Sequence, residues 1–528
     1  MRLRDDSVRC VRDRLARFVY SGSRERIRRL FQSRENLNVD TGTPRRPTGL
    51  PGLDEVLHGG LVPERAYLVR GGPGTGKTTL GLHFLAAGVA LGERALLITL
   101  ESSETQLRND AAAQGLDLSG ITFLDLSPTR EFFAQNQSYD IFSPADVERD
   151  PTTRQIVETI EGLKPQRVFV DAVTTLRYLA PDAFQFRKQA LSFVRYLVEH
   201  GATVLLSSEP TESVPDDDLR FMSDGIIDLE ISARHGVLRR YLSVSKMRGS
   251  DFQGGRHSMR LTATGMEVYP RLVPAAHERP FDPAPIPSGI GELDEMLCGG
   301  IERGTITILS GPSGVGKTTL GMQFMKEAAT RGERSVVYAF EEGMETLLHR
   351  CDNVGISVRD MMADGSLHVV EIEPLRFSPG EFALMVRREV EDRGVKIVMI
   401  DGVSGYRLTL AGDDLVMHLH SLGRYLKNMG VTVLLVNETD SITGDFRATD
   451  IGVSYLCDNL IFLRYLEMGG ELRKVVGVLK KRLSDFAKTL REIEVTCDGV
   501  QVGAPLAGLR GVLTGMPERV RHDDPPRG

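Results

Sequence analysis

Gly71-Gly72-Pro73-Gly74-Thr75-Gly76-Lys77-Thr78 and Gly311-Pro312-Ser313-Gly314-Val315-Gly316-Lys317-Thr318 fit one pattern, G-x-x-x-x-G-K-[ST]. Backbone N–H groups of such a loop wrap a triphosphate, while the lysine meets the β/γ oxygens and the hydroxyl binds Mg²⁺. One match can arise by chance, but here two matches stand 240 residues apart. We therefore predict two nucleoside-triphosphate sites, formed by these loops together with Thr79 and Thr319.

The repeat extends well beyond the loops. The lead-in at residues 48–61 corresponds to residues 288–301, again shifted by 240. Apolar runs before each loop predict strands, and the apolar periodicity after each loop predicts a helix. The predicted strands are 66–69, 95–100, 167–171, 306–309, 335–340 and 396–401, and the predicted helices are 79–91 and 319–329. Alternating strands and helices indicate an α/β fold of two tandem units, each a mostly parallel sheet with helices on both faces.

Composition places the boundaries between these units. We predict a first unit at 48–272, a proline-rich linker at 273–287 and a second unit at 288–502. The Gly/Pro-rich tail, 503–528, is expected to be flexible. Residues 1–47 hold thirteen arginines against six acidic residues, and we expect a poorly ordered basic extension there.

Carboxylates close or directly follow four of the predicted strands. Asp171 and Asp401 each close an apolar run and are candidates to complete Mg²⁺ binding with Thr78 and Thr318. The alternative is a simple strand-end cap.

Hydrolysis also needs a base that orients water opposite the γ-phosphate. Glu101 and Glu341 are the candidates, because we expect their strands to lie beside the phosphate-loop strands. Glu342 adds a second carboxylate to the second unit only, and adjacent carboxylates can raise one another's pKa. The alternative for all three is a solvated charged turn.

A basic segment recurs late in each unit. Residues 244–252 read V-S-K-M-R-G-S-D-F, and residues 478–486 read V-L-K-K-R-L-S-D-F. Strand alternation places Lys246 with Arg248 on one face, and likewise Lys480 with Arg482. These cations are candidates to stabilise the γ-phosphate of a neighbouring subunit, against the alternative of a solvated strand face.

Composition excludes several classes of protein. The net charge is −7, and without the basic extension the remainder carries −14, which argues against a nucleic-acid partner. Five scattered cysteines include no C-x-x-C pair, a pattern typical of a reducing compartment. The sequence contains no apolar run of about 18 residues that could span a bilayer. We expect a soluble cytoplasmic protein without a membrane partner.

Taken together, these motifs resemble the KaiC family, circadian clock ATPases and autokinases of the RecA-like class, over residues 48–502. The resemblance rests on the T/S-G-x-x-x-L-D-E-x-L-x-G-G lead-in, both phosphate loops, the glutamates and the K-x-R-x-S-D-F segment. It implies ATP and Mg²⁺ as cofactors, and a homohexamer with nucleotide at the subunit interfaces. It further implies that the second unit phosphorylates its own hydroxyls and that the protein acts in signalling through partner proteins.

The resemblance also indicates candidate phosphoacceptors. Ser454 and Thr449 stand in matching places before the strand at 459–462, but Tyr455 replaces the principal threonine acceptor. A geometry built for a short hydroxyl does not transfer directly to tyrosine. Two alternatives therefore stay open: a nucleotide-gated scaffold without phosphotransfer, and a RecA-type DNA-dependent ATPase. The acidic body, the 6% aromatic content and the absence of tryptophan speak against the second.

Overall fold

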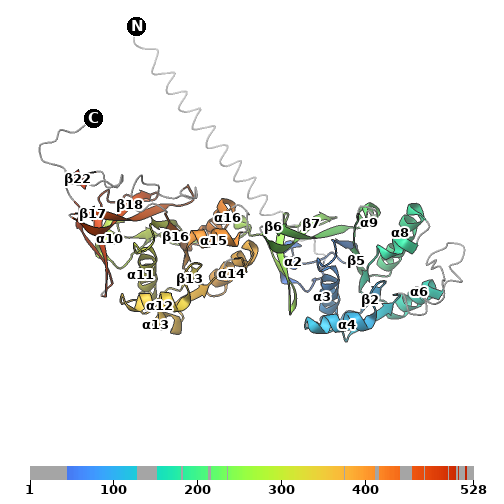
Figure 1. Ribbon diagram of the computed structural model, residues 1–528. Helices are drawn as coiled ribbons and strands as arrows, with labels where there is room; N and C mark the ends of the chain where they lie inside the picture. Colours follow the sequence, from blue (N-terminus) through green and yellow to red (C-terminus); the bar gives the residue numbers. More distant parts are fainter. Residues whose placement is uncertain are drawn as a thin grey trace, which may run out of the picture.

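The computed structural model describes two α/β units joined by a short linker (Figure 1). The described residues are 44–127, 151–179, 182–211, 216–234, 236–373, 375–410, 415–439, 455–468, 470–497, 499–506, 509–510 and 518–519. In this part of the chain, no helix combines the length and apolar character that crossing a bilayer requires.

The first unit alternates strands and helices and then ends in four consecutive strands. Its helices are α2 (Pro51–Val56), α3 (Lys77–Ala90), α4 (Glu104–Ala113), α6 (Pro151–Leu163), α7 (Thr175–Leu179), α8 (Ala183–Glu199) and α9 (Asp217–Met222). Its strands are β1 (Ala66–Arg70), β2 (Ala95–Thr99), β3 (Ile121–Asp125), β4 (Arg167–Asp171), β5 (Thr203–Ser208), β6 (Gly225–Arg234), β7 (Val237–Met247), β8 (His257–Thr262) and β9 (Gly265–Tyr269).

The second unit repeats this plan. Its helices are α10 (Gly291–Met296), α11 (Lys317–Thr330), α12 (Met344–Asp352), α13 (Val358–Ala363), α14 (Pro379–Glu391), α15 (Val403–Thr409) and α16 (Leu415–Asn428). The strands of its main sheet are β12 (Ile306–Gly311), β13 (Ser335–Ala339), β14 (Leu367–Glu371), β15 (Ile397–Asp401), β16 (Thr432–Glu438), β17 (Asn459–Met468), β18 (Glu471–Lys481), β19 (Arg491–Thr496) and β20 (Gly499–Pro505). Two small antiparallel pairs, β10 (Pro285–Ile286) with β11 (Ile301–Glu302) and β21 (Leu509–Arg510) with β22 (Glu518–Arg519), lie outside it.

Both main sheets have the same strand order. It is β3-β2-β4-β5-β1-β6-β7-β8-β9 in the first unit and β14-β13-β15-β16-β12-β17-β18-β19-β20 in the second. The first six strands of each order pair in parallel, and the last three extend the sheet by antiparallel pairing. The predicted fold class, two RecA-like units with helices on both faces of mostly parallel sheets, is confirmed.

Each sheet buries both of its faces. Alternate residues of β1 belong to different apolar clusters: Tyr67 and Val69 pack with α3 and α4, whereas Ala66 and Leu68 pack with α6 and α8. This period of two explains why the central strands read as continuous apolar runs. A sheet covered on both faces leaves its strand ends as the place where polar side chains can gather.

The linker is attached to the second unit. Its 3₁₀ turn, Pro274–Ala276, lies on α16, and Asn428 donates a hydrogen bond to the carbonyl of Pro274 at 2.9 Å. Farther on, β10 pairs with β11. At the other end of the unit, β20 continues through Pro505, three residues beyond the predicted boundary at Val502.

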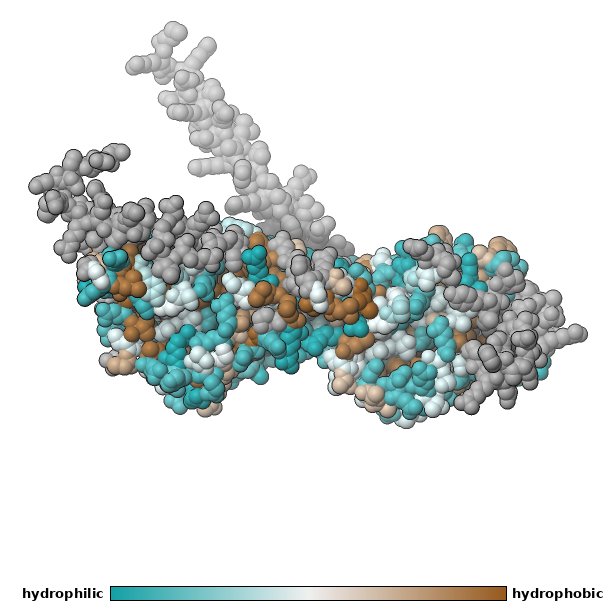
Figure 2. Space-filling view, viewed as in Figure 1, coloured by the Kyte–Doolittle hydropathy of each residue, from teal (hydrophilic) through white to brown (hydrophobic). Residues whose placement is uncertain are grey.

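Polar contacts also join the two units directly. Arg260 pairs with Glu381 at 2.7 Å, and Arg387 pairs with Glu55 at 2.7 Å. Arg239 donates hydrogen bonds to the carbonyl oxygens at the end of α15. In Figure 1, α14–α16 accordingly lie beside β6 and β7, and in Figure 2 apolar surface gathers over this junction.

The structure corrects two expectations. The helices after the loops begin at Lys77 and Lys317, not at Thr79 and Thr319. The residue before each helix, Gly76 or Gly316, has a positive φ, and this turn of the backbone lets the helix start at the lysine itself. The expectation that the strands before the glutamates lie beside the phosphate-loop strands is also wrong. Two strands, β4 and β5, separate β2 from β1, and β15 with β16 separate β13 from β12.

Candidate functional site

The two phosphate loops connect β1 to α3 and β12 to α11 at the carboxyl edge of each sheet. Lys77 Nζ lies 2.8 Å from the carbonyl oxygen of Gly71 and 2.9 Å from that of Gly72. Lys317 Nζ lies 2.7 Å from the carbonyl oxygen of Pro312. Both lysines are buried, and burial lowers the pKa of Lys317, although Glu438, Asp401 and Glu341 oppose the shift. In each unit, the loop therefore holds the amino group of its lysine against backbone carbonyl oxygens of the same loop.

The predicted magnesium ligands are brought together in both units. Thr78 Oγ1 donates to Asp171 Oδ2 at 2.8 Å, and Thr318 Oγ1 donates to Asp401 Oδ1 at 2.9 Å. Burial raises the pKa of Asp401 to about 6, while Thr318 and Arg350 act in the opposite direction. A hydroxyl and a carboxylate at the mouth of a phosphate loop are the hard oxygen donors that Mg²⁺ prefers. The residues present therefore fit this ion.

The glutamates reach the same edge from β2 and β13. Glu101 Oε1 accepts a hydrogen bond from Thr175 at 2.7 Å. Glu341 and Asp401 both line one cavity of about 390 Å³ together with Lys317 and Thr318. Glu342 lines it too, but its carboxylate pairs with Arg350 at 2.8 Å. The second carboxylate is therefore held by a cation and does not form a pair with Glu341.

The basic residues lie at the far edge of each sheet, which is the edge formed by the amino ends of the parallel strands, opposite the carboxyl edge that carries the phosphate loops. Lys480 pairs across the sheet with Leu460, and Leu460 pairs with Ile308, near the start of β12. Because β18 runs antiparallel to β12, Arg482 lies beyond this start, whereas the phosphate loop follows Gly311. The five steps along β12 span about 17 Å at the usual strand rise. Lys480 and Arg482 therefore lie at the end of the sheet opposite the phosphate loop of their own unit.

The same register holds in the first unit. Lys246 pairs with Ile226, and Ile226 pairs with Leu68. Its amino group donates to the carbonyl of Arg220 at 2.8 Å, and Arg248 lies 3.9 Å from Asp224. Both cations are thus on the far edge from the first phosphate loop.

A model of the KaiC ATPase family matches residues 46–273 and, a second time, residues 286–507. The chain belongs to the KaiC family. It is 26% identical over 502 residues to the circadian clock oscillator protein KaiC of Parathermosynechococcus lividus, covering 93% of this chain and 91% of that protein. It is 27% identical over 487 residues to the circadian clock protein KaiC3 of Synechocystis, covering 90% and 95%. The KaiC of Synechococcus elongatus is 26% identical over 488 residues, covering 90% and 92%.

This KaiC-family chain places two more pairs of residues at its nucleotide sites, and the sequence reasoning missed them. Glu209 Oε2 lies 3.2 Å from Lys77 Nζ, and Glu438 lines the cavity of the second unit. Both follow the repeated T-V-L-L strands, so a carboxylate repeating at a strand end was the available signal.

Arg240 and Lys474 contact the loops through the carbonyls of Gly74 and Gly314, each at 3.2 Å. They stand six residues before Lys246 and Lys480, on the same strands.

The candidate phosphoacceptors of this KaiC-family chain, Ser454 and Thr449, lie outside the described residues. Tyr455 follows directly and its side chain is exposed. Its carbonyl oxygen accepts a hydrogen bond from Arg482 at 3.1 Å. Tyr455 therefore stands at the edge of the sheet that carries the basic residues, away from the phosphate loop of its own unit.

Proposed function

We propose that this chain is an ATPase that binds ATP and Mg²⁺ at both phosphate loops and works as a cytoplasmic homohexamer in signalling, through partner proteins. One observation carries the proposal: in both units the loop threonine is hydrogen bonded to the strand-end aspartate, at 2.8 Å and 2.9 Å. The presence of this arrangement in both units, each time at the carboxyl edge of a parallel sheet, favours triphosphate hydrolysis over a structural role. The proposed units are residues 48–272 and 288–502.

The side chains divide the work of hydrolysis. We assign Lys77 and Lys317 to the β/γ-phosphates, and the Thr78–Asp171 and Thr318–Asp401 pairs to Mg²⁺. When bound, this ion neutralises charge that develops on the phosphates. Glu101 and Glu341 orient and deprotonate the attacking water.

The far-edge position of the basic residues supports the ring. Lys246 and Arg248, like Lys480 and Arg482, lie about one strand length away from their own loop, so they need another subunit's nucleotide to act on. A cation supplied in trans stabilises charge in the transition state and accounts for a large part of the rate in related chemistry. A head-to-tail contact between identical chains forms a ring when the rotation between neighbours closes, and in such a ring every subunit both gives and receives such a cation.

The second unit is our candidate for autophosphorylation. Ser454 and Thr449 are the proposed acceptors, with Glu341 as the base and Glu342 assisting it. Tyr455, which directly follows Ser454 in the sequence, lies at the far edge with Arg482, and this favours phosphotransfer between adjacent subunits over transfer within one chain. The competing function is a nucleotide-gated scaffold, and Tyr455 in place of a short hydroxyl favours it.

Purified protein with Lys77→Ala, Lys317→Ala or both tests the hydrolysis. We expect each single change to remove one class of ATP site and the double change to abolish binding and turnover, measured by nucleotide titration and phosphate release. Retained turnover in the double variant would refute the proposal.

Phosphosite mapping after incubation with ATP and Mg²⁺ separates kinase from scaffold, since phosphate between Thr449 and Tyr455 is expected only from the kinase.

A further inference from the structure

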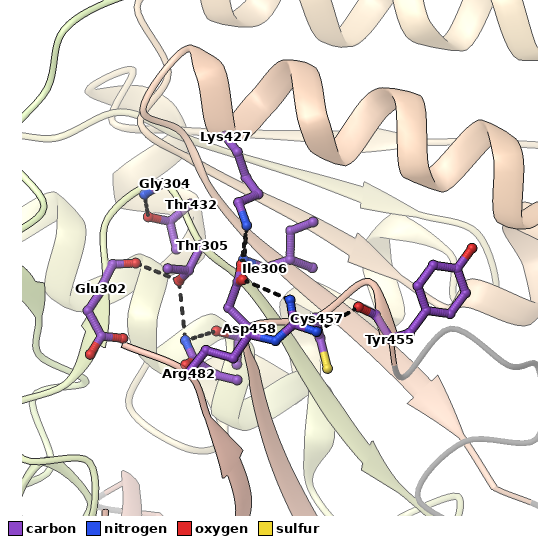
Figure 3. Close-up of polar contacts among 12 residues, drawn as sticks. Glu302, Gly304, Thr305, Ile306, Lys427, Thr432, Tyr455, Cys457, Asp458 and Arg482 are labelled. Atoms are coloured by element: carbon purple, nitrogen blue, oxygen red, sulfur yellow. Dashed lines mark hydrogen bonds and ion pairs between the residues drawn. The ribbon is translucent and has the colours of Figure 1, made fainter. Parts of the chain in front are cut away.

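Asp458 is the residue at which three elements of the second unit meet (Figure 3). Its side chain is almost completely buried directly before β17. Its carboxylate accepts hydrogen bonds from the backbone N–H of Ile306 at 3.0 Å and from Lys427 Nζ at 2.8 Å. Its own N–H donates to the carbonyl of Ile306 at 2.8 Å. Asp458 is therefore fixed to the first residue of β12, the strand that leads into the phosphate loop.

Arg482 is held from this fixed point. Its backbone N–H donates to the Asp458 carbonyl at 3.1 Å, and its guanidinium lies 3.8 Å from the Asp458 carboxylate. The guanidinium also donates to the carbonyl of Tyr455 at 3.1 Å, while about half of the side chain stays exposed. Asp458 thus sets both the backbone position of Arg482 and the direction of its charge.

The first unit repeats this arrangement. Asp224 Oδ2 accepts from the N–H of Ala66, the first residue of β1, at 3.2 Å. The backbone N–H of Arg248 donates to the Asp224 carbonyl at 2.8 Å, and the Arg248 guanidinium lies 3.9 Å from the Asp224 carboxylate. An arrangement that recurs around both basic segments points to their shared task, because fold stability alone does not require an exposed arginine at the same place.

The units differ in one cation. Lys427 on α16 neutralises Asp458, whereas Val198 on α8 stands at the corresponding position of the first unit. Because Lys427 lies 2.8 Å from the Asp458 carboxylate and Arg482 lies 3.8 Å from it, half exposed to solvent, the carboxylate orients the Arg482 guanidinium without locking it in a tight ion pair. Lys427 therefore leaves Arg482 oriented but free to turn toward a phosphate.

We propose that Asp458 is a positioning residue for ATP hydrolysis in the second unit: it aims Arg482 at the γ-phosphate bound by the adjacent subunit. Asp224 does the same for Arg248 in the first unit. This inference rests on the proposed function, in which those arginines act in trans. Neither aspartate touches nucleotide in this scheme.

Asp458→Asn tests the inference in the full chain. Asparagine can still accept the Ile306 hydrogen bond but loses the charge that directs Arg482. We expect kcat for second-unit ATP turnover to fall roughly tenfold with KM little changed, at the lower end of what orienting partners contribute at other sites. Asp364→Asn, which removes an exposed carboxylate from the turn after α13, is the matched control and should leave turnover unchanged.

A mixture of two variant chains distinguishes the loss of Arg482 positioning from local unfolding around Asp458. Asp458→Asn chains keep an intact second phosphate loop, and Lys317→Ala chains keep a correctly positioned Arg482. In an equimolar mixture, some subunit interfaces therefore pair the intact loop of one chain with the intact arginine of the next. Random assembly gives about one quarter of second-unit sites both an intact loop and an intact arginine. We expect turnover above that of either variant alone.

The same mixture made with Arg482→Ala chains tests the proposed function separately. If Arg482→Ala is rescued by Lys317→Ala chains while Asp458→Asn is not, Asp458 acts on folding alone and the inference is overturned. Unchanged turnover in Asp458→Asn overturns it as well. If the Arg482→Ala mixture shows no rescue, the trans role itself fails, and the inference fails with it.

Discussion

At the scale of single residues, the two units hold the glutamates that we propose as catalytic bases in different ways. In the first unit Thr175 donates a hydrogen bond to Glu101. In the second unit, two glycines lie against the Glu341 side chain. A Cβ on Gly402 would stand 2.1 Å from Glu341 Oε1, and a Cβ on Gly405 would stand 3.4 Å from Glu341 Cγ. The second unit therefore positions its glutamate by leaving space for it, and the first by a direct bond.

Gly402→Ala should for this reason impair chemistry more than binding. The new methyl group would displace the Glu341 carboxylate, and misplacing a reacting group by about 1 Å can cost up to about 10²-fold in rate. We expect second-unit kcat to fall about tenfold or more with little change in KM for ATP, measured as phosphate release in the Lys77→Ala background.

Gly365→Ala is the control for this change. Gly365 also has a positive φ, +77° against +129° at Gly402, but nothing lies within 4 Å of its Cβ position. It carries the backbone penalty of alanine without the contact. Equal losses in the two variants would show that backbone strain, and not displacement of Glu341, lowers the rate.

At the scale of elements, the helix after each phosphate loop approaches the aspartate-bearing strand through a glycine. A Cβ on Gly81 of α3 would stand 2.2 Å from the Phe169 ring of β4. On Gly321 of α11 it would stand 2.7 Å from Met399 Sδ of β15. This close approach brings the loop threonine at the start of each helix within hydrogen-bonding distance of the aspartate that ends the strand.

The two glycines predict unequal tolerance to alanine. The Phe169 ring is rigid and cannot yield, so Gly81→Ala should destabilise the first unit by about 1–3 kcal/mol. Met399 can change rotamer, so Gly321→Ala should cost less than about 1 kcal/mol, partly offset by the higher helix propensity of alanine. Urea unfolding measures both. Gly162→Ala in α6, where the Cβ position is open, is the control and should be neutral or stabilising. A larger loss for Gly321→Ala than for Gly81→Ala would contradict the packing argument.

At the scale of the whole molecule, neighbouring residues of β7 connect the two nucleotide sites. Arg240 contacts the first phosphate loop through Gly74, and Arg239 binds the carboxyl end of α15. The helix α15 begins two residues after Asp401 of the second site. With the Arg260–Glu381 and Arg387–Glu55 pairs, these contacts dock the units through polar groups.

Removing the three arginines together should loosen this docking. The ion pairs of Arg260 and Arg387 contribute roughly 0–1 kcal/mol each, and the hydrogen bonds of Arg239 to backbone carbonyls contribute about as much. We therefore expect Arg239→Ala, Arg260→Ala and Arg387→Ala to matter in combination more than singly. The triple variant should be cut faster by protease within the linker at 273–287. An Arg187→Ala, Arg359→Ala variant removes exposed arginines elsewhere and should be cut at the wild-type rate. Equal cutting rates in the triple variant and the wild type would show that other contacts hold the units together.

Much of the nucleotide site follows from the sequence alone. The loop lysines and threonines, the strand-end aspartates and the glutamates Glu101 and Glu341 are local features: each stands at the end of an apolar run or in a glycine-rich turn. Their spacing repeats in both halves, so one half checks the other. A residue at the end of a parallel strand reaches the carboxyl edge whatever the order of the strands, which is why the predicted residues converge although the expected neighbours of β2 and β13 were wrong.

Only the tertiary structure decides which of these residues lie at which phosphate loop. Strand order and antiparallel register put Arg240 and Lys474 at their own loops, but Lys246 and Lys480 at the far edge. The pairing of Glu342 with Arg350 and the position of Asp458 between Ile306 and Arg482 likewise depend on segments distant in the chain. Such contacts form when whole elements pack, and no local pattern of residue types records which elements become neighbours.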